Sequence, residues 1–112
     1  MLSENQSREI LREIFEARGL QIAEDFPFRE RGVAFSIDGW DAAKRIGYEF
    51  MTEREHDHED LNPDELGQIW QWNAEGSLHL LIIDETEVET ADDLKAQAHA
   101  FLDELDRPKA PR

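Results

Sequence analysis

The sequence predicts one small α+β domain with elements in the order α-β-β-β-α-β-α and a mixed sheet covered by helices on at least one face. Three observations support this class. The length of 112 residues fits a single domain. Apolar residues recur with helical spacing in some segments and alternate with polar residues in others. A strand-like segment flanked by helices near the end of the chain favours a mixed sheet.

The first expected elements are a helix over Ser3–Arg18 and a strand over Leu20–Glu24. Apolar residues in the helical segment recur at positions i, i+1, i+4 and i+5, which gives one apolar stripe. Ser3 or Ser7 can cap its first turn, and Gly19 suits the left-handed residue that ends a helix. The strand is predicted from its alternation of apolar and polar residues.

The next part of the chain is expected to form a hairpin. Residues 25–32 predict a turn or irregular hairpin, because Pro27 argues against a central strand. Val33–Asp38 and Ile46–Thr52 alternate apolar and polar residues, so each predicts a strand. The connection Gly39–Arg45 is short enough to pair these two strands antiparallel.

The second half of the chain predicts a helix, a strand and a last helix. Asn62 is the expected cap of the first of these helices, Trp70 lies on its buried face, and Gly76 ends it. Leu78–Ile83 is a nearly continuous apolar run, typical of a strand that is buried on both faces. Ala91–Leu105 follows as the last helix, with acidic residues in its first turn.

Negative charge is the most prominent feature of the composition. The chain holds 27 Asp and Glu residues against 12 Lys and Arg, for a net charge of −15. Three of the basic residues lie in residues 107–112, which hold no acid, so residues 1–106 carry a net charge of −18. Such a surface repels nucleic-acid backbones and favours a basic protein, a divalent cation or simply solubility. We therefore expect no direct nucleic-acid binding.

The composition also limits the compartment and the chemistry. The chain has no cysteine, which excludes disulfides, thiolate catalysis and cysteine-based zinc sites. No apolar run approaches the ~20 residues that a membrane helix needs. The first residues are polar and acidic, unlike a secretory signal or a transit peptide. We expect a cytoplasmic domain over residues 1–106, without membrane contact, and a disordered basic tail over residues 107–112.

Asp38 and Glu49 are the most specific candidates for chemistry. Both lie on the less apolar face of adjacent strands, so a hairpin would bring them together. Two close carboxylates disfavour joint ionisation unless a cation neutralises them, and Mg²⁺ or Mn²⁺ takes such oxygen ligands. Alternatively, Asp38 closes a turn with Gly39, and Glu49 is an exposed strand residue. His56 and His58 are a further candidate metal pair, although short acidic-histidine runs usually form solvated loops.

This element order, with an acid ending the second strand and another in the third, resembles that of PD-(D/E)XK nucleases. The resemblance covers most of the chain by element order but only two or three residues by motif. It implies metal-dependent phosphodiester hydrolysis by Asp38 and Glu49, with Glu13 as an accessory carboxylate. The lysine position of the family holds Met51, and Lys44 is the alternative source of an ammonium group. The resemblance therefore points to a degenerate, non-catalytic relative.

The tryptophans suggest a binding surface. Trp72 lies off the main apolar stripe of its helix, and Trp40 is expected at the hairpin tip beside Asp41. Exposed tryptophans ringed by acids suit a protein-binding patch, although both rings could instead fold back onto the domain. Our leading hypothesis is a non-catalytic interaction domain without a cofactor, of inhibitor, immunity or adaptor type, that binds a basic protein. A metal-dependent phosphodiesterase and a structural or assembly subunit are the alternatives, and the oligomeric state stays open.

Overall fold

The computed structural model describes residues 3–51, 63–84 and 88–106, and the expected order α-β-β-β-α-β-α is confirmed. The elements are α1 (Glu4–Ala17), β1 (Ala23–Glu30), β2 (Val33–Asp41), β3 (Ile46–Met51), α2 (Pro63–Glu75), β4 (His79–Asp84) and α3 (Ala91–Asp106). The proposed cap Asn62, the pair His56 and His58, and the tail over residues 107–112 lie outside the described residues.

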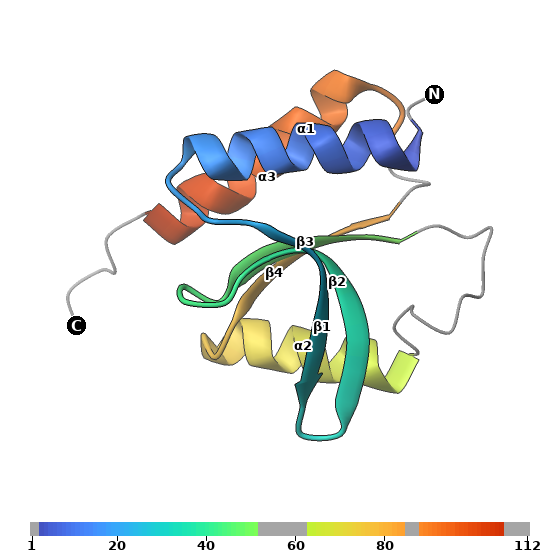
Figure 1. Ribbon diagram of the computed structural model, residues 1–112, viewed down its shortest axis with the longest axis vertical. Helices are drawn as coiled ribbons and strands as arrows, with labels where there is room; N and C mark the ends of the chain where they lie inside the picture. Colours follow the sequence, from blue (N-terminus) through green and yellow to red (C-terminus); the bar gives the residue numbers. More distant parts are fainter. Residues whose placement is uncertain (1–2, 52–62, 85–87, 107–112) are drawn as a thin grey trace.

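The sheet is mixed, as predicted, and helices cover both of its faces. Its strand order is β1-β2-β3-β4, with antiparallel pairing among the first three strands and parallel pairing between β3 and β4. Figure 1 shows α1 and α3 side by side on one face and α2 on the other. The α+β class is therefore confirmed.

Local sequence signals account for the first helix and its ends. The Ser3 hydroxyl accepts a hydrogen bond from the Gln6 N–H at 3.1 Å, and the Gln6 side chain accepts one from the Ser3 N–H at 3.0 Å. This reciprocal capping box fixes the start of α1. Gly19 follows the helix with φ of +91°, a conformation that glycine adopts without steric cost.

The expected turn over residues 25–32 is wrong, because β1 runs through Pro27. The strand lies at the edge of the sheet, where one side has no neighbouring strand and proline is tolerated. Pro27 is exposed, while Phe28 is buried against the α2 face. The turn itself contains only Arg31 and Gly32, both with positive φ, as a two-residue hairpin loop of type I′ requires.

β2 is longer than predicted, and this moves Trp40 from a hairpin tip into the sheet. β2 extends to Asp41, and Trp40 pairs with Gly47 of β3. A Cβ atom at Gly47 would lie 2.7 Å from the Trp40 ring, so the close approach of this strand pair requires glycine. Trp40 is 2% exposed, and the prediction of an exposed tip residue is wrong.

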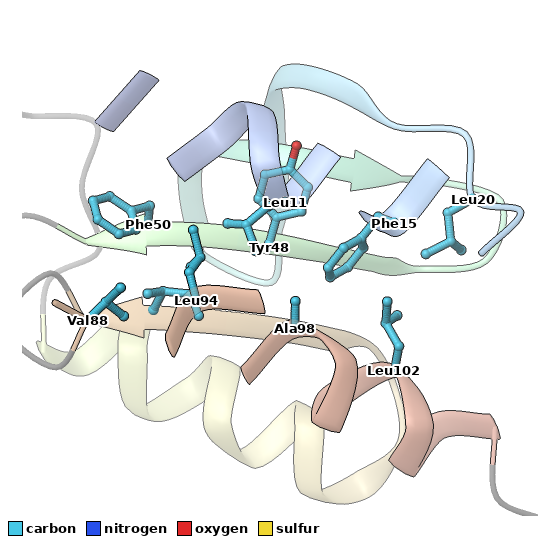
Figure 2. Packing of buried hydrophobic residues seen from close by; sticks show 10 residues of the cluster. Leu11, Phe15, Leu20, Tyr48, Phe50, Val88, Leu94, Ala98 and Leu102 are labelled. Carbon is cyan, nitrogen blue, oxygen red and sulfur yellow. The ribbon is translucent and has the colours of Figure 1, made fainter. Parts of the chain in front are cut away.

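Two hydrophobic cores lie on opposite faces of the sheet. The first joins α1 and α3 to β3 and β4, with Tyr48 and Phe50 pointing between the helices (Figure 2). The second lies beneath α2. Its buried members come from β1, β2, α2 and β4 and the residue before β4: Phe28, Val33, Phe35, Ile37, Trp40, Ile69, Trp72, Leu78 and Leu80. The sheet is thus buried on both faces, which explains the continuous apolar run of β4.

The assignment of the buried tryptophan in α2 is also wrong. Ile69 and Trp72 face the sheet, whereas Trp70 is 61% exposed. Residues 70 and 72 are ~200° apart around a helix, so only one of them can face the same core. Trp72 belongs to the second core, where its ring centroid lies 6.4 Å from that of Phe28.

The open edge of β4 is covered by a side chain of α2. The Leu80 N–H donates to Asn73 Oδ1 at 2.8 Å, and Asn73 Nδ2 donates to the Leu80 carbonyl at 3.3 Å. A single amide group therefore satisfies both backbone groups of Leu80. The opposite side of β4 pairs with β3.

Candidate functional site

The structure brings Asp38 and Glu49 together at the point where the ladder between β2 and β3 ends. The last paired residues there are Gly39 and Tyr48. Beyond them, the Asp38 N–H donates to Glu49 Oε1 at 3.0 Å. The Phe50 N–H donates to Asp38 Oδ2 at 2.7 Å. The two carboxylates therefore accept backbone hydrogen bonds that a longer ladder would have provided.

This arrangement corrects both simpler interpretations of the acids. Glu49 is 2% exposed, so it is not an exposed strand residue. Asp38 lies inside β2 and does not close a turn with Gly39, because the turn comes after Asp41. Figure 1 shows β1 and β2 bending away from β3 as a long hairpin, and the two acids lie where this divergence begins. Their contacts are those of groups that join diverging strands.

Arg8 of α1 supplies positive charge beside this pair. Its Nε lies 3.8 Å from Asp38 Oδ1, and its Nη2 lies 2.7 Å from Asp25 Oδ1. Burial alone would lower the pKa of Arg8, but the neighbouring carboxylates of Asp38, Asp25 and Glu24 raise it above the ordinary value. Arg8 therefore remains a fixed cation. Within the described ranges, no group of three or more His, Asp or Glu side chains is arranged to hold a metal ion.

The other residues that the nuclease resemblance implied lie elsewhere. Glu13 is exposed on α1, whereas the sheet-facing stripe of that helix contains Leu11 and Phe15. Lys44 lies in the turn between β2 and β3, where its Nζ donates to the Gly19 carbonyl at 3.0 Å. Met51 is the last residue of β3 and pairs with β4. Glu13 is therefore exposed to solvent, Lys44 is hydrogen-bonded to Gly19, and the position two residues after Glu49 holds Met51, which has no charge.

A small polar recess between α1 and β1 was not predicted from the sequence. It has a volume of about 220 Å³ and is lined by Asn5, Arg8, Glu9, Arg12 and Glu24. The spacing of Arg8 and Arg12 by four residues is the signal that could have found it. Arg12 Nη1 lies 3.1 Å from Glu24 Oε1, and Arg8 pairs with Asp25. Both arginines are therefore ion-paired within the protein. The lining holds two Arg and two Glu residues.

The Tyr48 hydroxyl lies in the same region, beneath α1. Tyr48 is completely buried, and its ring lies against Gly39, where a Cβ atom would overlap the ring. Burial raises the pKa of Tyr48 well above its ordinary value, and the negative charges of Glu24 and Asp38 add to this. Tyr48 therefore stays protonated in neutral solution, and its ring is part of the first core.

Trp40, Trp72 and Asp41, the predicted protein-binding residues, are all buried. Trp72 is 3% exposed and Asp41 is also 3% exposed. Asp41 Oδ2 accepts the Gln21 N–H at 2.9 Å, and Asp41 Oδ1 accepts the Lys44 N–H at 2.9 Å. Burial would raise the pKa of Asp41, but these backbone donors hold it below the ordinary value. Asp41 thus fixes the turn between β2 and β3.

The residue that offers an exposed aromatic surface is Trp70. In the part of the chain that the structure describes, it is the one large hydrophobic side chain classed as exposed. Its neighbours one turn away on α2 are small, Gly67 and Ala74, and both are exposed. We call these three residues the Trp70 face. Sequence reasoning missed it because Leu66, Ile69 and Trp70 follow the i, i+3, i+4 spacing of a buried stripe, which placed Trp70 in the core.

Comparisons with protein-family models, curated proteins and solved structures find no match for this chain. None of the helices in residues 3–51, 63–84 and 88–106 has the length and apolar character needed to cross a membrane.

Proposed function

We propose that this chain is a non-catalytic interaction domain that binds a basic protein partner through the outer face of α2. The observation that carries the proposal is the 61% exposure of Trp70 on a helix without a basic residue. Tryptophan is enriched among the residues that contribute most to binding energy at protein interfaces. The Trp70 face is the place in the described chain where such a residue is accessible.

The charge distribution supports a basic partner. Within α2 the charged residues are Asp64, Glu65 and Glu75, and the whole chain has a net charge of −15. The side chain of Glu65 accepts the Ala34 N–H, while Asp64 and Glu75 are exposed at the two ends of the helix. Complementary charge accelerates association and excludes acidic partners. An exposed aromatic residue on a helix whose exposed charges are all negative therefore fits a basic polypeptide.

The contacts of the paired acids support a non-catalytic role. Asp38 and Glu49 accept backbone hydrogen bonds between β2 and β3, and Arg8 lies beside Asp38. A metal ion would compete with these donors for the carboxylate oxygens. Lys44 was the alternative source of the family's ammonium group. Its Nζ donates a hydrogen bond to the Gly19 carbonyl. The acids therefore have a structural use that requires no substrate.

A titration with a capped nona-arginine peptide, followed by NMR, tests the proposal. We expect the largest shift changes in α2, and affinity that falls as salt is added. Two matched double variants remove the same charge at different places: Asp64→Asn with Glu75→Gln on α2, and Glu13→Gln with Glu16→Gln on α1. The α2 variant should bind more weakly than the α1 variant. Equal affinities, or affinity that salt does not change, would contradict a binding face on α2.

Two further measurements separate the alternative functions. Calorimetry with Mg²⁺ and Mn²⁺ tests the phosphodiesterase, since metal binding that Glu49→Gln abolishes would overturn the non-catalytic proposal. Sedimentation over a range of concentrations tests the assembly subunit. Self-association that Trp70→Ala abolishes would mean that the Trp70 face contacts a second copy of this chain instead of a basic partner.

A further inference from the structure

We infer that the Trp70 ring is the receptor for an arginine side chain of the basic partner. This inference rests on the proposed function, because it names the group that the outer face of α2 would recognise. A guanidinium stacked on an aromatic face is attracted by the negative charge of the ring surface. Three features of the described chain support this occupant.

The first feature is the way in which this protein uses its other tryptophans. The Arg45 guanidinium lies over the Trp40 ring at 5.9 Å from the centroid, and the Arg31 guanidinium lies over Trp72 at 5.9 Å. Across residues 3–51, 63–84 and 88–106, no arginine or lysine lies over the Trp70 ring. Both buried rings thus have an internal cation, and the exposed ring is left for an external one.

The second feature is the space around the ring. A helical side chain leans toward the N-terminus of its helix, so we expect Trp70 to lean toward the turn that contains Gly67. Apart from the two adjacent residues and the backbone of the helix, no heavy atom lies within 4 Å of a Cβ atom built on Gly67. Ala74 is the small, exposed residue of the following turn. The helix surface beside Trp70 therefore leaves room for a flat guanidinium.

The third feature is the charge of α2, which favours arginine over an apolar or acidic group. Asp64 and Glu75 lie six residues before and five residues after Trp70, both roughly 120–140° around the helix from it, and α2 has no basic residue. Arginine is more weakly hydrated than lysine, and its N–H groups remain free for carboxylates while its plane stacks on a ring. Lysine can also contact the ring, but its stronger hydration makes the gain in binding free energy smaller. We therefore expect the Trp70 face to prefer arginine at equal charge.

The test compares capped nona-arginine with capped nona-lysine on the wild-type protein, Trp70→Phe and Trp70→Leu. We expect nona-arginine to shift the Trp70 indole N–H signal, which is identified by its loss in Trp70→Leu. Replacement by leucine should weaken nona-arginine binding about fivefold, and phenylalanine should restore most of it. Gln71→Leu is the control, since it changes an exposed neighbour without removing an aromatic ring. Cooperative unfolding transitions with the slope of the wild type would verify that the variants fold.

The outcomes separate this inference from the proposed function. Wild-type affinity in Trp70→Leu, with binding still centred on α2, would overturn the arginine receptor and leave the interaction domain standing. Equal affinity for the two peptides at equal ionic strength would also overturn it. Absence of peptide binding to the wild-type protein, or shift changes spread evenly over all acidic surfaces, would overturn both.

Discussion

Replacing Trp40 and Trp70 separately by alanine tests the placement of the two rings on which the functional argument depends. Trp40 is 2% exposed and Trp70 is 61% exposed. A tryptophan side chain of about 200 Å² buried at ~25 cal/mol per Å² contributes at most about 5 kcal/mol. We therefore expect Trp40→Ala to lower the free energy of unfolding by about 4 kcal/mol, within the range for buried aromatic residues.

The same calculation gives a much smaller effect for Trp70. About two-fifths of this residue is buried, so its upper limit is about 2 kcal/mol. Alanine returns about 0.5 kcal/mol through its higher helix propensity. We expect a net loss of about 1 kcal/mol or less for Trp70→Ala. The ratio between the losses of unfolding free energy in Trp40→Ala and Trp70→Ala is therefore a sharper test than either loss alone.

Denaturant unfolding followed by far-ultraviolet circular dichroism is the suitable assay, because each substitution removes one of the three tryptophan fluorophores. A lower midpoint with an unchanged slope would report a change in stability. A loss of about 4 kcal/mol approaches the total stability of many domains. Trp40→Phe, with an expected loss of about 2 kcal/mol, keeps the comparison measurable if Trp40→Ala does not fold. Equal losses for Trp40→Ala and Trp70→Ala would refute the placement of the two rings.

Other contacts give three further predictions. Glu49→Ala should lower the free energy of unfolding by about 2 kcal/mol, because the Asp38 N–H loses a charged acceptor. Glu49→Gln keeps a carbonyl oxygen at this place and should lower it by less than about 1 kcal/mol. Equal losses in denaturant unfolding would contradict this role. The pKa of Asp41 is lowered on folding, so its stabilisation should be complete above pH ~3.9 and disappear as the pH falls through the folded pKa. Thermal unfolding of the wild type and Asp41→Asn from pH 2 to 7 should show two midpoints that converge in acid, and a constant difference would argue against it. Asn73→Ala should cost about 1 kcal/mol and increase self-association in sedimentation, because it uncovers Leu80 at the edge of β4, while Gln71→Ala should do neither.

Local signals predicted the order of elements well, because those signals act over a few residues. The Ser3 cap, the stop at Gly19 and the alternation of β2 and β3 all depend on neighbours in sequence. The alternation also predicted that Asp38 and Glu49 would meet. It could not predict that backbone N–H groups would bind their carboxylates, since that follows from the divergence of β2 and β3.

The errors concern properties that depend on the whole fold. Pro27 excludes a central strand, but only the completed sheet shows that β1 is an edge strand. The spacing of Leu66, Ile69 and Trp70 predicted a buried Trp70, but in the fold Ile69 and Trp72 pack into the second core and Trp70 is exposed. Trp40 was placed in a turn because strand length is poorly defined by alternation alone. The two errors at the tryptophans reversed the exposure of Trp40 and Trp72, which is why the proposed binding surface moved to Trp70.

The contact between Asn73 and Leu80 links two properties that are usually separate. An asparagine side chain carries the same carbonyl and N–H groups as a peptide bond. The Asn73 amide of α2 therefore bonds to Leu80 in the way that the backbone of a neighbouring strand would. The helix that covers one apolar face of the sheet therefore also satisfies one backbone position on its open edge. Any movement that lifts α2 would expose the second core and the backbone groups of Leu80 at the same moment. Attachment of this one helix thus conceals two features that promote association when they are exposed.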